Sequence, residues 1–131
     1  MKCEDLLHFY NTVIRPSLEY ASVAWSTGIT QHHSDMLESL QKRAFATIYP
    51  HQTYSEALDS TKSKRLAQRR KEINIKFWAK IKDPTDRCNH LITRKQTLQY
   101  NFRNQIKYEL PRIRTERFKQ SYIPYSLFNL Q

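Results

Sequence analysis

The first 81 positions of the chain repeat apolar residues with the 3.6-residue period of an α-helix. Pro16 separates the first two apolar runs and suits the first turn of a new helix, where its missing N–H has no helical partner. Ser34 has the residue type of a helix N-cap, and Pro50 and Asp83-Pro84 end the runs that precede them. The pattern predicts helices over 4–14, 16–25, 35–48, 54–58 and 62–81.

Beyond residue 84 the helical period fades. The segment 93–105 is polar with several apolar residues at every second position, so a short strand is possible there. Pro111 and Pro124 interrupt the remainder. We therefore expect a mainly α fold, a small bundle of about four to five helices over 1–83 with an irregular, partly extended C-terminal tail over 84–131. This basic tail is expected either to pack on the bundle or to be disordered.

Four residues are predicted to be structural. Trp25 ends the second helix on its apolar side, and Phe77 lies on the apolar stripe of the last helix. Gln41 lies inside the apolar stripe of 35–48, which predicts a buried, hydrogen-bonded amide. Arg70 projects into the stripe of the last helix, where a guanidinium must be paired. The sequence offers three carboxylates for it without choosing among them: Glu19, Glu38 and Glu56.

Positive charge is concentrated in the second part of the chain. The formal net charge is +10, and residues 59–131 hold eighteen Lys/Arg against six Asp/Glu, whereas residues 1–58 hold four against six. An excess of this size repels itself unless a polyanion neutralises it, and RNA or DNA is the expected partner. The alternative is a surface that serves only solubility.

Five cations follow one flank of the predicted 62–81 helix: Lys62, Arg65, Arg69, Lys76 and Lys80. Phosphate binding needs cations along a line, and a neighbouring aromatic ring can stack on a base. Trp78 lies at the edge of the apolar stripe, so it either packs in the core or takes this stacking role. We predict sequence-nonspecific nucleic-acid binding through these five cations and Trp78.

The sequence holds no arrangement typical of an enzyme. It has no Asp-Asp pair for two-metal polymerase chemistry, no nucleotide-binding loop around its single glycine, and no histidine or cysteine pairs at zinc-site spacing. We expect no catalytic residues, metal or cofactor. The N-terminus does not resemble a signal peptide and no apolar run approaches the ~20 residues of a membrane span. The expected location is intracellular, in the nucleus or cytoplasm, neither secreted nor in a membrane.

Five ordered segments resemble the region that follows the catalytic core in LINE-type (non-LTR) retrotransposon reverse transcriptases. The first contains that family's Arg-Pro, Leu-Glu-Tyr and closing tryptophan, the fourth its Leu-x-x-Arg-Arg, and the last its Arg-Thr-x-Arg and later proline. The segments are Tyr10–Trp25, Leu37–Ala44, Tyr54–Leu58, Leu66–Arg70 and Arg114–Pro124. The chain departs from the family where Leu127-Phe-Asn replaces Leu-Trp-Asn.

The resemblance implies an origin in jockey- or CR1-like transposable elements, whose polypeptides carry an endonuclease and an RNA-directed DNA polymerase upstream. It implies contact with template RNA or a primer–template duplex, and with the upstream polymerase core. The expected function is that of a catalytically inactive fragment of a reverse transcriptase that contacts nucleic acid. The alternative is a structural or interaction fragment, or a translated relic, without independent function. The oligomeric state stays open.

Overall fold

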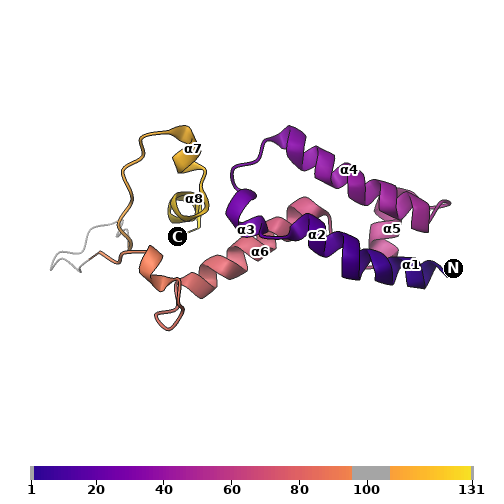
Figure 1. The fold of residues 1–131 in the computed structure, drawn as a ribbon, viewed down its shortest axis with the longest axis horizontal. Helices are drawn as coiled ribbons and strands as arrows, with labels where there is room; N and C mark the ends of the chain where they lie inside the picture. The colour runs from indigo at the N-terminus through magenta and orange to yellow at the C-terminus, as the bar shows by residue number, and fades with distance from the viewer. Residues whose placement is uncertain (1, 96–106, 131) are drawn as a thin grey trace. The chain divides into compact units, whose positions relative to one another are not determined.

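Helices dominate the computed structural model, which describes residues 2–95 and 107–130 (Figure 1). Their bounds are α1 Cys3–Phe9, the π-helical turn η1 Tyr10–Ile14, α2 Arg15–Glu19, α3 Ser22–Trp25, α4 Gln31–Ile48, α5 Tyr54–Ser60, α6 Leu66–Ile81, the 3₁₀ turn η2 Asn89–Leu91, α7 Glu116–Lys119 and α8 Tyr122–Asn129. The β-structure of the described residues is a single antiparallel bridge between Arg94 and Tyr108. The prediction of a mainly α fold is confirmed.

The chain packs into two compact units. Unit 1 comprises Met1–Ser22 and Ile29–Glu72, and unit 2 comprises Val23–Gly28 and Ile73–Gln131. The division falls within α6, ahead of the boundary at residue 83 that the hydrophobic pattern predicts. The described part of the expected tail is not separate from the helices, because it forms a hydrophobic core with the second half of α6.

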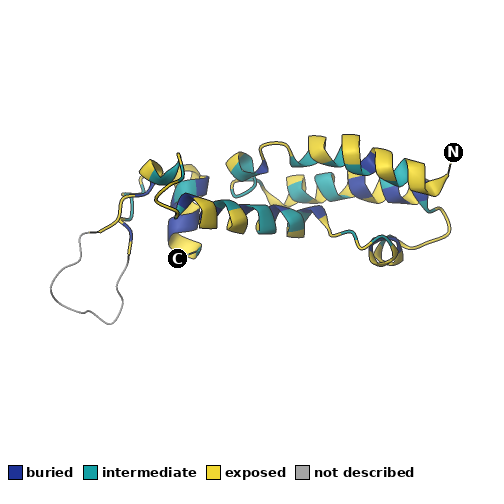
Figure 2. Cartoon of the chain, turned by 90° about the horizontal axis from the view of Figure 1, so that it is seen from below, coloured by how far each residue is buried: buried dark blue, intermediate teal, exposed yellow. Residues whose placement is uncertain are grey.

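The core of unit 1 is built where α1, η1, α4 and α5 meet. Its buried residues are Tyr10, Phe45, Ile48, Ala57 and Leu58. The ring of Tyr10 meets Phe45 edge to face, with 5.3 Å between centroids, a favoured aromatic geometry. Figure 2 shows the result as stripes of buried and half-buried residues on helices whose other faces are exposed.

The expected break at Pro16 is wrong, because the helix continues through it to Glu19. An α-helical proline would clash with the carbonyl four residues earlier. Here the preceding turn is π-helical, and the N–H of Arg15 donates to Tyr10 O, five residues back. The wider turn changes the hydrogen-bond register just before Pro16. The chain instead turns after Glu19, where Ala21 takes a left-handed φ of 49°.

Two further helix starts differ from the sequence prediction. α4 begins at Gln31, since Thr30 rather than Ser34 is its N-cap and accepts a hydrogen bond from the His33 N–H. α6 begins at Leu66 instead of residue 62. The end of α5 occupies the intervening residues: Lys62 adopts a φ of 53°, and the Ser63 N–H donates to Leu58 O at 2.8 Å. This is a Schellman-type C-cap.

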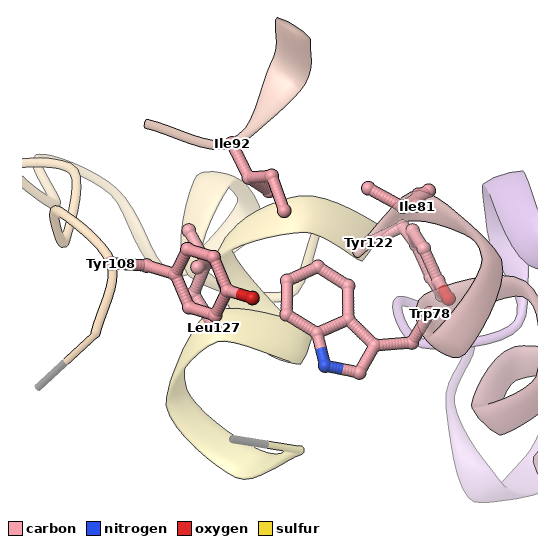
Figure 3. Close-up of a cluster of buried hydrophobic side chains, with 6 residues drawn as sticks. All are labelled: Trp78, Ile81, Ile92, Tyr108, Tyr122 and Leu127. Carbon is pink, nitrogen blue, oxygen red and sulfur yellow. The ribbon is translucent and has the colours of Figure 1, made fainter. Parts of the chain in front are cut away.

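The core of unit 2 joins α6 to the C-terminal region (Figure 3). It consists of Trp78, Ile81, Ile92, Tyr108, Tyr122 and Leu127. Two hydrogen bonds fix the α8 region on α6: Trp78 Nε1 donates to Leu130 O at 3.0 Å, and the Tyr122 hydroxyl donates to Asn74 O at 2.6 Å. Most of the possible strand 93–105 lies outside the described residues.

The expectation that Pro124 breaks the C-terminal region is wrong. Pro124 lies in the first turn of α8, a position whose N–H has no intrahelical acceptor. Thr115 caps α7 by accepting from the Phe118 N–H at 3.2 Å, and Ser121 occupies the N-cap position of α8. Two helices therefore begin at residues of common N-cap types, although this region has no long run of apolar residues at helical spacing.

Candidate nucleic-acid interface

The two polar residues expected in the core are buried. The side-chain amide of Gln41 donates to Lys64 O at 3.1 Å, which ties α4 to the segment before α6. Arg70 is 4% exposed and donates to the Ser34 hydroxyl at 2.6 Å. Burial lowers the pKa of the Arg70 guanidinium, and the charges of Glu38 and Glu19 oppose that shift. Two of the three proposed carboxylates therefore act on Arg70 electrostatically.

The third proposed partner of Arg70 has another role. Glu56 belongs to the capping box of α5, where its carboxylate accepts from the Thr53 N–H at 2.8 Å. These hydrogen bonds lower the pKa of Glu56. The residue therefore stabilises the first turn of its own helix.

The aromatic assignments need two corrections. Trp25 was expected in the core but is half-buried, because the turn at Tyr20–Ala21 ends the helix that was to align it with Leu18. Trp78 was expected to stack on a base but is 2% exposed. Its ring meets Tyr108 edge to face at 6.2 Å between centroids, so no base can reach it. Phe77 is half-buried and lies 5.6 Å from the ring of Tyr122.

The five expected cations do not share one helix. Lys62 lies in the turn after α5, and Arg65 precedes α6 with its guanidinium 6.0 Å from the centre of the Tyr54 ring. Of the three on α6, Lys80 pairs with Asp86 at 3.7 Å, and Lys76 is exposed. The predicted line of five cations therefore begins at Lys62, four residues before the first residue of α6.

Arg69 is held by an ion pair within unit 1. Its Nε and Nη2 both donate to the Glu19 carboxylate, the latter at 3.0 Å. Both side chains are largely covered, at 30% and 12% exposed. The hydrogen bonds with Glu19 raise the pKa of Arg69. This guanidinium is engaged in the fold, which leaves it a poor candidate for a phosphate.

The surplus of positive charge belongs to unit 2. That unit contains twelve Lys/Arg and four Asp/Glu, an excess of eight, whereas unit 1 contains ten and eight, an excess of two. Nearly all the described cations of unit 2 have exposed side chains. The basic surface is therefore a property of unit 2 and extends well beyond Lys76 and Lys80.

The highest density of positive charge on this surface lies in the segment 112–119. The sequence prediction, which considered only one flank of the 62–81 helix, did not include this segment. It carries four exposed cations and one acid, Glu116: the cations are Arg112, Arg114, Arg117 and Lys119. The Lys119 ammonium lies 3.9 Å from Glu116, a weak surface pair. The four cations within eight consecutive residues are visible in the sequence and could have identified the segment.

Within residues 2–95 and 107–130, no three His, Cys, Asp or Glu side chains gather where they could hold a metal ion. None of the helices in these ranges has both the length and the apolar character needed to cross a bilayer. No family model, curated protein or solved structure matches the chain.

Proposed function

We propose that the chain is a catalytically inactive C-terminal segment of a LINE-type reverse transcriptase, an RNA-directed DNA polymerase, and that it contacts RNA or DNA through unit 2. The observation that carries the binding proposal is the excess of eight positive charges on that unit. Because each neutralised phosphate releases condensed counterions, such a surface binds nucleic acid without reading its sequence.

The bonds within unit 1 support the family part of the proposal. The segments that resemble the reverse transcriptases supply polar groups to one another: Glu19 pairs with Arg69, and Glu38 accepts from both the Tyr54 hydroxyl and the Leu66 N–H. Four separate motifs thus meet in a single packed unit. Under the proposal, relatives with the same motifs would make the same contacts.

The test measures the salt dependence of binding by the full chain. Fluorescence anisotropy with a labelled single-stranded RNA and a DNA duplex should show affinity for both that falls steeply between about 50 and 200 mM salt. In the variant Arg112→Gln/Arg114→Gln, the slope of log affinity against log salt for the single strand should decrease by about 1.4, since each phosphate contact contributes about 0.7.

The matched control removes the same charge from unit 1. Arg43→Gln/Lys71→Gln changes two exposed cations of α4 and α6, and its slope should equal that of the parent chain. Equal losses in both variants would contradict a specific role for unit 2. Absence of binding by the parent at about 50 mM salt would refute the binding proposal.

The chain alone should incorporate no labelled nucleotide on a primed template with Mg²⁺, because two-metal transfer needs converging carboxylates. Reproducible incorporation by the repurified chain would overturn this part of the proposal.

A second candidate, an interaction fragment without nucleic-acid affinity, is favoured by exposed apolar side chains in unit 1. These are Phe9, Val13, Met36 and Leu40. The binding experiment separates the two candidates, because only a nucleic-acid contact produces a steep salt slope.

A further inference from the structure

Two aromatic rings of α8 are exposed although the opposite face of the helix forms core. Tyr125 is 36% exposed and Phe128 is 45% exposed. Residues three apart on a helix are neighbours, so the two rings share one face. Ser126 and Leu127 point away from this face and are buried. The helix that carries the exposed pair is anchored on α6, because the Tyr122 hydroxyl donates to Asn74 O at 2.6 Å.

A third exposed ring lies in the neighbouring α7, which Figure 1 shows beside α8. Phe118 is 42% exposed and stands between Arg117 and Lys119. Its carbonyl accepts from both the N–H and the hydroxyl of Ser121, the N-cap of α8, at 3.1 and 2.7 Å. These bonds join the two helices in a defined corner.

Positive charge precedes α8 along the chain. The segment 112–119, which leads into α7 and includes it, contains four exposed cations and one acid. The helix α8 contains no charged residue. Exposed aromatic rings in a helix that directly follows a segment of exposed cations match an unpaired nucleic-acid strand, whose bases stack and whose phosphates need neutralising. In a duplex the base faces are already stacked on one another. An apolar protein partner would leave the four cations without counter-charges.

We propose that the α7–α8 corner binds single-stranded nucleic acid by stacking bases on Tyr125 and Phe128 while the cations of 112–119 hold its phosphates. The proposal rests on the proposed function and assigns the strand type and the contacting residues. Phe118 supplies a further ring at the edge of the same surface.

The test uses the full chain and three probes of equal length: an oligothymidylate, an abasic strand with the same phosphates, and a duplex. The parent chain should bind oligothymidylate at least about tenfold more tightly than the abasic strand, as expected for stacking of one or two bases. The variant Tyr125→Leu/Phe128→Leu keeps exposed apolar side chains but removes the rings. It should lose that discrimination while keeping the salt slope, because no charge changes.

Two matched variants complete the design. Tyr125→Phe/Phe128→Tyr keeps both rings and should bind like the parent. Ile75→Leu/Leu91→Ile changes two exposed apolar residues elsewhere in unit 2 and should do the same. If the parent binds all three probes alike, or the leucine variant keeps its preference for bases, the stacking proposal is overturned and the proposed function stands. If the parent binds none of the probes, both fail.

Discussion

The carboxylate of Glu38 accepts a hydrogen bond from the Leu66 N–H at 3.1 Å, so a residue of α4 caps the first turn of α6. The other oxygen of Glu38 accepts from the Tyr54 hydroxyl of α5 at 2.5 Å. Burial and the hydrogen bond with Glu38 raise the pKa of Tyr54. One side chain thus sets where α6 begins and how three helices of unit 1 meet.

Replacing this carboxylate should destabilise the fold. Glu38→Ala leaves the Leu66 N–H and the Tyr54 hydroxyl without their acceptor, at a cost of about 1–3 kcal/mol in the free energy of unfolding. Urea denaturation followed by far-UV circular dichroism measures the change. Arg43→Ala, an exposed site on the same helix, should stay within about 0.5 kcal/mol of the parent. A harmless Glu38→Ala would mean that the capping bond contributes nothing.

The ion pair between Arg69 and Glu19 should be visible as coupling. Because hydrogen bonds to charged groups contribute about 1.5–3 kcal/mol and partial exposure reduces that value, a double-mutant cycle with Arg69→Gln and Glu19→Gln should give about 1–2 kcal/mol. Urea unfolding of the four proteins provides the cycle. If the two substitutions change the free energy of unfolding additively, the ion pair contributes no coupling energy.

Glycine should improve the turn after α5. Lys62 holds a φ of 53° at the C-terminal cap, a conformation that carries a steric cost for any residue with a Cβ. We expect Lys62→Gly to raise the free energy of unfolding by about 0.5–1 kcal/mol. Lys62→Ala removes the same charge but keeps the Cβ, so it should give little gain. A loss of stability in the glycine variant would contradict the strain argument.

Tyr10 should make the fold sensitive to alkali. Burial raises the pKa of Tyr10 to about 12, against the nearby charge of Arg15. Above a pH of about 10 the unfolded chain releases this proton first, so stability falls with rising pH until about 12. The Tyr10 hydroxyl has no hydrogen-bond partner among the described residues. Tyr10→Phe should therefore keep or increase stability at neutral pH.

Urea unfolding at several pH values between 8 and 12, an interval set by the ordinary tyrosine pKa of about 10, tests this behaviour. The decline above pH 10 should be shallower in Tyr10→Phe than in the parent. The remaining slope comes from Tyr54 and Tyr122, whose pKa values burial also raises. A parent and a variant with identical alkaline profiles would refute the assignment.

The two tryptophans should differ in their contribution to stability. Trp78→Ala removes a buried ring and the hydrogen bond to Leu130 O, and should cost about 3–5 kcal/mol. Trp25→Ala should cost about 1–2 kcal/mol, because part of that ring is already exposed to water. Thermal or urea unfolding ranks them. The reverse order would place Trp25 in the core after all.

The mainly α fold and the approximate positions of α4, α5 and α6 could be predicted from the sequence, because the 3.6-residue period of apolar residues is a local signal. The sequence also determined that the core would bury Gln41 and Arg70, since each interrupts an apolar stripe. The caps Thr115 and Ser121 were equally readable and would have predicted α7 and α8. The long charge run before them was readable too.

Which side chains are available for binding depends on contacts between distant parts of the chain. Arg69 and Glu19 stand fifty residues apart, and no local pattern says that they pair. Trp78 lies at the edge of a helical stripe, and it is buried in a cluster with Ile92, Tyr108, Tyr122 and Leu127. α6 begins at Leu66 because Glu38 caps it from another helix. Periodicity fixes which face of a helix is apolar, but the covering partners come from distant parts of the chain, and they set the burial and pairing of residues at its edge.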